Sequence, residues 1–128
     1  MAELERKRIL VVDDESTARE FYQALLKKHG YDADVAVDGN DAFRKVNRTA
    51  YDLVHMDIRM PNQDGVGSAI SIGLVRPDIP ILVVSGFLDD NVLKELEKES
   101  NIRGWMKKPT GAEAYLNAVR RILDGFDA

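Results

Sequence analysis

The sequence predicts an α/β fold in which a parallel β-sheet carries helices on both of its faces. Short apolar runs and amphipathic stretches alternate along the chain, and this strand–helix unit occurs five times. Such alternation is typical of parallel sheets with helical crossovers. The apolar runs are nearly continuous, which indicates strands buried on both faces. With right-handed crossovers, these units give a doubly wound sheet.

The first unit combines a buried strand with a long helix. The run "RILVV" at 8–12 is short, apolar and rich in β-branched residues, as buried strands are. The stretch 16–30 carries apolar residues at helical spacing, so we predict a helix there. Ser16 or Thr17 is the expected N-cap of this helix, and Gly30 is expected to end it.

The second unit and the third strand continue the pattern. "ADVAV" at 33–37 is predicted to be a strand, and 39–50 a short helix with Asn40 as its expected cap. "DLVHMDI" at 52–58 is predicted to be the third strand. For His55, inside this strand, we favour a packed or hydrogen-bonded side chain over a chemical role.

The segment 65–77, between the third and fourth strands, has a weaker signal. The alternation of elements requires a helix, but Gly67 and Gly73 each cost a helix about 1 kcal/mol relative to Ala. Two interpretations stay open: a helix held by packing against the rest of the protein, or a locally mobile segment used in partner binding.

The last two units complete the sheet. "PILVVSG" at 80–86 and "IRGWMKKP" at 102–109 are predicted to be the fourth and fifth strands. Amphipathic stretches at 90–100 and 111–125 are predicted to be helices, the second of them ended by Gly125.

The composition narrows the class of protein. The chain has 128 residues, of which 45% are apolar and 31% charged, so one globular domain is expected. A net charge of −4 argues against direct binding of nucleic acid. The lack of Cys excludes disulfides and thiolate metal sites. The sequence contains neither a signal peptide nor a long apolar span, so we expect no membrane association and a cytoplasmic location.

Polar residues gather where the predicted strands end. In a doubly wound sheet, ligands bind beyond the carboxyl ends of the strands. Carboxylates packed together repel one another, and a hard divalent cation such as Mg²⁺, or Mn²⁺ in its place, relieves this repulsion. A carboxylate beside a metal and a lysine is suited to attack phosphorus and form an acyl phosphate. Three acids, a hydroxyl and a lysine are expected at this edge: Asp13, Asp14, Asp57, Ser85 and Lys108.

Each of these residues also has an ordinary structural interpretation. Asp13 and Asp14 could simply cap the first helix, and Asp57 could be a turn residue. Ser85 and Lys108 could be a loop serine and a solvated lysine. The functional interpretation depends on all of them converging at one edge, which capping or solvated residues need not do.

Four motifs, "ILVVDDEST", "DLVHMDIRMPNQDG", "ILVVSG" and "WMKKP", occur in this order along the chain. With them the chain resembles the receiver domains of response regulators in two-component signalling, from about Arg8 to Leu123. The resemblance implies a flavodoxin-like fold, a three-layer α/β/α sandwich around a five-stranded parallel sheet of order 2-1-3-4-5. It also implies a single receiver domain over 1–128, with its core at about 8–123.

The resemblance implies a role for each residue at the predicted edge. Asp57 matches the phosphoacceptor, which takes a phosphoryl group from a histidine kinase or a phosphotransfer protein. Asp14, Asp57 and the main-chain carbonyl of Arg59 match the direct Mg²⁺ ligands. Asp13 matches the acid that holds the metal mostly through water, and Lys108 matches the lysine of the family's site.

Ser85 and Trp105 match the two residues of the family's switch. In the family, phosphorylation draws the hydroxyl inward and an aromatic side chain follows. The face formed by the fourth helix, the fifth strand and the fifth helix then changes for a downstream protein target or a homodimer. Trp105 stands where the family usually has Tyr or Phe, and Gly86, without a Cβ, is expected to leave room for the indole. The resemblance also implies a cis peptide bond between Lys108 and Pro109.

Two positions are expected to modulate the site. Arg59 lies two residues past Asp57, and Phe87 lies two residues past Ser85. In the family, side chains at these positions border the path of the hydrolysing water, so two bulky groups suggest a slowly decaying phosphoryl group. Alternatively, Arg59 pairs with Glu15 in the resting protein.

Two rival functions stay open beside a receiver, which would catalyse nothing beyond its own phosphorylation and dephosphorylation. A phosphatase with an aspartyl nucleophile would carry Asp-x-Asp-x-Thr after its first strand, where this chain has "DDEST". A pseudo-receiver that only binds a partner predicts a damaged site, whereas all five key side chains occur here. The sequence also leaves open a stand-alone receiver or a piece of a longer regulator, although the initial Met fits a natural N-terminus.

Overall fold

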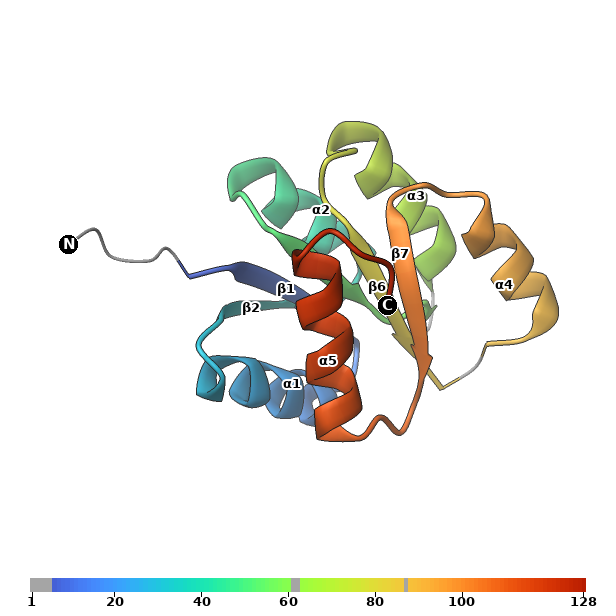
Figure 1. Ribbon diagram of the computed structural model, residues 1–128. Coiled ribbons are helices and arrows are strands. Elements are labelled where there is room, and N and C mark those ends of the chain that lie inside the picture. Colours follow the sequence, from blue (N-terminus) through green and yellow to red (C-terminus); the bar gives the residue numbers. More distant parts are fainter. Residues whose placement is uncertain (1–5, 61–62, 87) are drawn as a thin grey trace.

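A five-stranded parallel sheet forms the middle layer of the protein (Figure 1). The structure is a computed structural model that describes residues 6–60, 63–86 and 88–128. The strand order is β2-β1-β3-β6-β7, and every neighbouring pair is parallel. Since β6 and β7 are the fourth and fifth predicted strands, the predicted order 2-1-3-4-5 is confirmed. The strands are β1 (Arg8–Val12), β2 (Asp32–Ala36), β3 (Leu53–Met56), β6 (Ile81–Ser85) and β7 (Ile102–Lys107).

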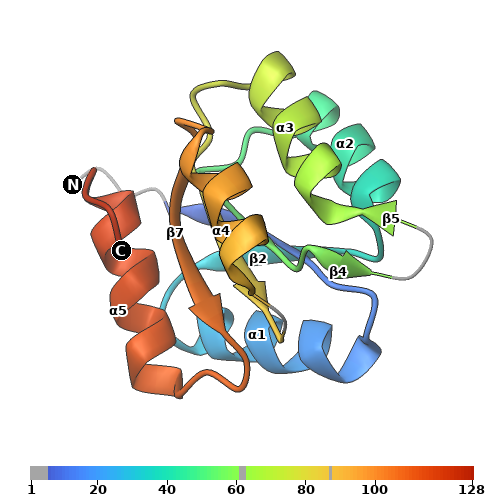
Figure 2. The same cartoon turned by 90° about the vertical axis from the view of Figure 1, so that its right-hand side faces the viewer.

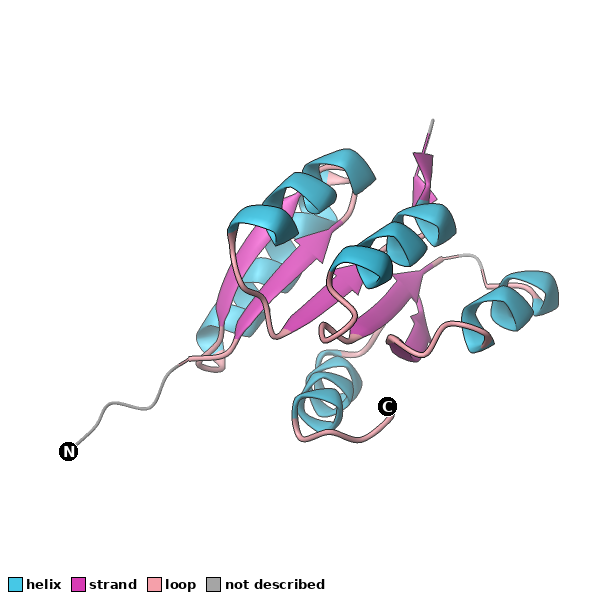
Figure 3. Ribbon diagram, turned by 90° about the horizontal axis from the view of Figure 1, so that it is seen from above, coloured by secondary structure: helices cyan, strands magenta, loops and turns pink. Residues whose placement is uncertain are grey.

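Helices cover both faces of this sheet (Figures 1 and 3). Two of them, α1 (Ser16–Lys28) and α5 (Ala112–Leu123), pack on one face. The other face carries α2 (Gly39–Arg48), α3 (Gly65–Val75) and α4 (Asp90–Glu97). This is the predicted three-layer sandwich. Among the described residues, no helix has the length and apolar character that crossing a membrane requires.

The alternation of side chains along the strands divides the core in two. In β1, Leu10 and Val12 pack in the cluster under α2, α3 and α4, whereas Ile9 and Val11 pack in the cluster under α1 and α5. All four side chains are fully buried. Successive residues of a strand point to opposite faces, so an uninterrupted apolar run serves both clusters. Because all five strands are parallel, their carboxyl ends come together at one edge.

The N-cap of α1 differs from the prediction. Glu15 is the N-cap, in an extended conformation with φ −90° and ψ 123°, and Ser16 is the first residue of the helix. The expectation that Ser16 or Thr17 would cap α1 is therefore wrong. The other end follows the sequence, because Gly30 adopts a positive φ of 90° just after the helix, where glycine is favoured.

The cap of α2 also lies earlier than predicted. The side chain of Asp38 accepts a hydrogen bond of 2.8 Å from the main-chain nitrogen of Asp41. Asn40, the expected cap, lies inside the helix. Asp and Asn are equally good cap residues, so residue type alone could not distinguish the two positions.

A short antiparallel hairpin between β3 and α3 was not predicted (Figure 2). It joins β4 (Arg59–Met60) to β5 (Gln63–Asp64), with Arg59 paired to Asp64. Strands of two residues are too short to show a period of two in the sequence. The hairpin begins two residues after Asp57 and leads the chain from the sheet edge into α3.

The glycine-rich segment forms the helix α3 despite its poor propensity. Ala69 and Ile72 on this helix are fully buried in the core. A Cβ at Gly73 would lie 2.6 Å from Nδ2 of Asn101, so α3 approaches the start of β7 more closely than a larger residue would permit. These contacts support the interpretation that tertiary packing holds the helix.

Candidate functional site

The functional residues named from the sequence stand at the carboxyl ends of four different elements of the sheet. Asp13 is the first residue after β1, with Asp14 next to it, and Asp57 is the first residue after β3. Ser85 is the last residue of β6, and Lys108 is the first residue after β7. Because parallel strands end at the same edge, five residues spread over 96 positions of the sequence are brought together.

Main-chain hydrogen bonds fix where two of these residues leave the sheet. The nitrogen of Asp57 donates to the carbonyl of Val12 at 2.9 Å, and the nitrogen of Lys108 donates to the carbonyl of Ser85 at 2.9 Å. Both bonds continue the ladder of the sheet by one residue beyond the strands. The side chains of Asp57 and Lys108 are therefore carried by rigid backbone rather than by free loops.

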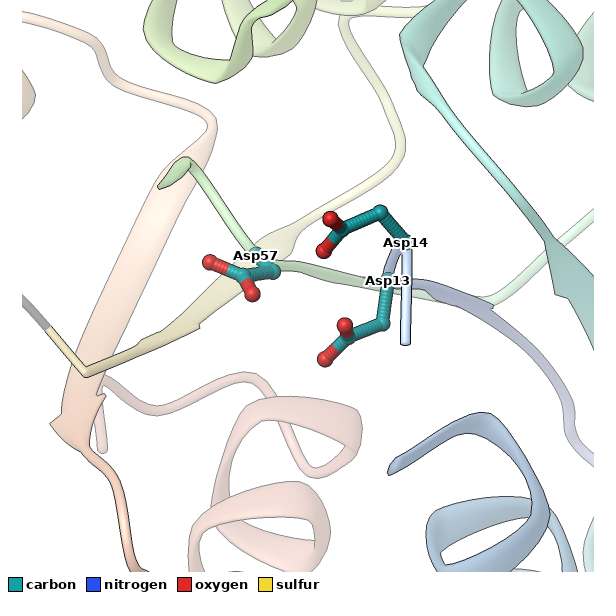
Figure 4. Close-up of side chains that lie close together, drawn as sticks. All are labelled: Asp13, Asp14 and Asp57. Carbon is teal, nitrogen blue, oxygen red and sulfur yellow. The ribbon is translucent and has the colours of Figure 1, made fainter. Parts of the chain in front are cut away.

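Three carboxylates share one small region at this edge (Figure 4). One oxygen from each of Asp13, Asp14 and Asp57 lies within 4.8 Å of the others. Asp13 is 0% exposed and Asp57 is 4% exposed, whereas Asp14 is open to solvent. Two of the acids therefore depend on nearby groups, rather than on bulk water, to stabilise their charge.

The ammonium group of Lys108 supplies part of that stabilisation. Its Nζ lies 2.5 Å from Oδ2 of Asp13 and 3.1 Å from Oδ2 of Asp57. Burial alone would lower the pKa of Lys108, but the hydrogen bond to Asp13 and the charge of Asp57 outweigh it, so the pKa is raised. The lysine is thus held in its charged form between two acids, as expected for a lysine that pairs with an acid at rest.

Asp13 has further contacts that orient it. Its Oδ1 accepts a hydrogen bond of 3.0 Å from the main-chain nitrogen of Glu15, and its main-chain carbonyl accepts one of 2.8 Å from Nη1 of Arg19. The contact of Arg19 with the main chain of Asp13 was not predicted from the sequence. Arg19 lies in the predicted helix at a position where a solvent-exposed arginine is ordinary, and it belongs to none of the four motifs.

The donor set fits a divalent cation that prefers oxygen ligands. When ionised, the three carboxylates carry three negative charges and Lys108 offsets one, which leaves two. Mg²⁺ and Mn²⁺ favour carboxylate, carbonyl and water ligands. Asp13, Asp14 and Asp57 are therefore the described side chains that would hold such an ion.

For two of the predicted modulating residues, the structure describes only the backbone or nothing at all. The backbone of Arg59 belongs to β4, two residues beyond Asp57, but its side chain is not among the described ones. Phe87 lies outside the described residues. The expected metal ligand at the carbonyl of Arg59, and the alternative pairing of its side chain with the exposed Glu15, therefore stay predictions.

The two predicted switch residues differ in exposure. Ser85 is fully buried, whereas 40% of Trp105 is exposed on the edge strand β7. Gly86 is exposed, and a Cβ at this position would meet no described atom within 4 Å. This position is therefore open, and its expected role in leaving room for the indole stays a prediction. The peptide bond between Lys108 and Pro109 is cis, as predicted.

His55 is a packed residue, as expected from the sequence. It is fully buried, and its Nδ1 lies 2.8 Å from the hydroxyl of Tyr115. Its Nε2 has no hydrogen-bond partner among the described residues. Burial, with a smaller contribution from the charge of Lys108, lowers the pKa of His55 to about 3. A neutral, enclosed imidazole is not accessible to a phosphoryl donor.

A model of a known protein family matches most of the chain. The model is described as the response regulator receiver domain, and it matches residues 9–120.

Curated proteins with similar sequences are longer than this chain. It is 40% identical over 79 residues to the transcriptional regulatory protein ZraR of Salmonella typhimurium, which covers 62% of this chain and 18% of ZraR. It is 36% identical over 117 residues to the transcription factor SKN7 of Candida albicans, covering 91% of this chain and 21% of SKN7. The chain spans about a fifth of the length of these relatives.

Solved structures share the same architecture. A CheY-like receiver domain protein of Methanospirillum hungatei superposes with a TM-score of 0.90 at 22% identity, covering 94% of this chain and 95% of that one. At that identity the likeness shows the fold. The response regulator TrrA of Thermotoga maritima, crystallised in complex with Mg²⁺ and BeF, gives a TM-score of 0.81 at 30% identity, covering 91% and 98%.

Proposed function

The chain belongs to the response regulator receiver domain family, and on this premise we propose that Asp57 is its phosphoacceptor. One observation carries the proposal: Asp57 is a nearly buried carboxylate in a cluster with Asp13 and Asp14, and Lys108 lies 3.1 Å from its Oδ2. The donor is the phosphohistidine of a histidine kinase or of a phosphotransfer protein. We infer one receiver domain, with its core at about 8–123.

The chain's own side chains suit this transfer. A carboxylate oxygen of Asp57 forms the new P–O bond while the P–N bond of the phosphohistidine breaks, and the electron pair of that bond stays on the imidazole. The ammonium of Lys108, already beside Asp57, is placed to bind a phosphoryl oxygen. Asp57 is only 4% exposed, which limits the access of water to the acyl phosphate.

Mg²⁺ fits the same site, with Mn²⁺ as a substitute. When bound, the ion would offset the negative charge of the phosphoryl oxygens and of the carboxylates that surround them. Asp14, Asp57 and the main-chain carbonyl of Arg59 would be direct ligands, and Asp13 would act mostly through water. The clustered oxygens and the Mg²⁺ complex of the related TrrA support this assignment.

The output is a change of surface rather than a chemical product. The hydroxyl of Ser85 would move toward the phosphoryl group, and Trp105 would follow into the space beside Gly86. The face formed by α4, β7 and α5 would then bind a downstream protein target or a second copy of the chain. The exposure of Trp105 on β7 supports a residue that has room to move. Direct binding of nucleic acid is not part of this function.

The lifetime of the phosphoryl group depends on two further residues in this proposal. Arg59 and Phe87 would border the path of the hydrolysing water and slow the loss of the phosphoryl group. In the resting protein, Arg59 could instead pair with Glu15. An Arg59→Ala variant with an unchanged phosphoryl lifetime would contradict the first of these roles.

Intact-protein mass spectrometry after incubation with acetyl phosphate and Mg²⁺ tests the phosphoacceptor. We expect a gain of one phosphoryl group, lost in Asp57→Asn. Asp52→Asn, at the opposite end of β3, is the matched control and should still gain it. No gain in the parent protein would favour a pseudo-receiver, and continuous turnover of a small phosphate ester would favour the aspartyl phosphatase.

A further inference from the structure

Three rings pack against one another on the face of the sheet that α1 and α5 cover. Tyr22 of α1, His55 of β3 and Tyr115 of α5 are each at most 4% exposed. The ring centroid of Tyr22 lies 4.6 Å from that of His55 and 4.7 Å from that of Tyr115. Both helices lie on the same face of the sheet (Figure 1). Each ring comes from a different element, so the cluster joins α1, β3 and α5 into one rigid block.

The hydroxyl of Tyr22 connects this block to the turn between β7 and α5. It lies 2.8 Å from Oγ1 of Thr110. Thr110 follows Lys108 by two residues, and the nitrogen of Lys108 is itself bonded to the carbonyl of Ser85. The short segment that carries the lysine is therefore fastened on both sides, to β6 by its main chain and to α1 through a side chain.

The position of the main chain at Lys108 affects where its ammonium group lies, because the side chain of a lysine is long and flexible. The Nζ of Lys108 reaches Asp13 and Asp57 at the same time, with 20% of the side chain still exposed. Ordering such a side chain costs rotamer freedom, and a backbone held in the correct place limits the number of conformations that must be lost. A small displacement of a positioned group lowers the rate of a reaction that depends on it.

We propose that the hydrogen bond between Tyr22 and Thr110 positions Lys108 for phosphoryl transfer to Asp57. The proposal rests on the function proposed above. Among the described residues, the hydroxyls of Tyr22 and Thr110 bond to each other, and we assign both as positioning residues that act through Lys108. The contact joins residues 88 positions apart and ties α1 to the turn that follows Lys108.

Three variants isolate the hydrogen bond from the packing around it. Thr110→Val removes the hydroxyl at nearly constant volume, Thr110→Ser keeps it, and Tyr22→Phe removes the other hydroxyl but keeps the ring. Thr17→Val is the matched control, because Thr17 lines the same groove between α1 and the turn. Circular dichroism and urea unfolding verify the fold of each variant before kinetics.

The measured quantity is the initial rate of phosphorylation of Asp57 by acetyl phosphate with Mg²⁺. Thr110→Val and Tyr22→Phe should each lower this rate by about tenfold, and the double variant should be no slower than either. Thr110→Ser and Thr17→Val should stay near the parent rate. A parent rate in Thr110→Val would overturn the positioning role.

The Lys108→Ala background distinguishes positioning from general stabilisation. If Thr110 acts through Lys108, adding Thr110→Val to Lys108→Ala should not lower the residual rate further. A further loss in this background would overturn the proposal, since Thr110 would then act by another route. A parent protein that gains no phosphoryl group at all refutes the proposed function, and the positioning role with it.

Discussion

The ammonium of Lys108 is bound to the buried carboxylate of Asp13, with 2.5 Å between Nζ and Oδ2. This contact is shorter than the one to Asp57, at 3.1 Å. In the resting protein the lysine thus compensates an acid that water does not reach. The pKa of Lys108 is raised in the folded state, so its contribution to stability is fully present below the ordinary value of 10.5 and is lost as the pH rises through the folded value.

Removing this cation should destabilise the resting protein. In Lys108→Met, Asp13 and Asp57 lose their shared partner, and we expect a loss of about 2 kcal/mol in the free energy of unfolding at pH 7 without divalent ions. Urea unfolding measures it. The control is Lys107→Met, because the neighbouring lysine is exposed, and we expect its loss to stay below about 0.5 kcal/mol. Equal losses in the two variants would show that Lys108 does not compensate the buried acids.

A divalent ion should stabilise the folded protein through the three carboxylates. At an Mg²⁺ concentration of about ten times the Kd, linkage predicts a gain of about 1.4 kcal/mol. The measurement is the midpoint of thermal unfolding with Mg²⁺ or with EDTA. In Asp14→Asn the gain should disappear, while the variant in EDTA should be at least as stable as the parent, because one repulsive charge is removed. An undiminished gain in that variant would exclude Asp14 as a ligand.

The gathering of these acids could be read from the sequence because it depends on topology alone. Runs such as 8–12 and 80–86 mark buried parallel strands, and the carboxyl ends of parallel strands share an edge. The sequence therefore predicts that Asp13 and Asp57 lie close together. The glycine-rich segment 65–77 was also predicted as a helix, from the alternation rather than from its own propensity.

The helix caps, the short hairpin and the side-chain contacts could not be predicted from the sequence, because they depend on single rotamers or on very short elements. The cap of α2 fell on Asp38 rather than Asn40 because the path of the chain, not the residue type, selects among equivalent caps. The hairpin that begins at Arg59 has two residues in each strand. The contact of Tyr22 with Thr110 crosses 88 positions, and neither residue stands in a motif.

Lowering the pH should reduce the free energy of unfolding through protonation of His55. Its pKa in the folded state is about 3, below the ordinary value near 6.5. Between these values the unfolded chain binds a proton that the folded protein does not, so stability falls as the pH is lowered from about 6.5 toward 3, by up to about 1.4 kcal/mol per pH unit. The measurement is urea unfolding from pH 7 to pH 4.

Carboxylates contribute to the same slope, so the comparison must be made with a variant. His55→Asn lacks the imidazole, and its free energy of unfolding should fall less steeply with acid than that of the parent. His29→Asn is the control, since His29 lies exposed at the end of α1, and it should keep the parent slope. Identical slopes in His55→Asn and the parent would show that the buried imidazole does not resist protonation.

Trp105 should report the activated state. It is the sole Trp of the chain, and 40% of it is exposed on β7. If a phosphoryl mimic shifts the population toward an inward indole, emission should move to shorter wavelength and quenching by acrylamide should fall when beryllofluoride and Mg²⁺ are added. Ser85→Ala should reduce this response, because the hydroxyl that would draw the indole inward is gone. Gly86→Val should also reduce it by filling the open space beside the strand. A parent protein that binds beryllofluoride with unchanged emission would exclude Trp105 from the switch.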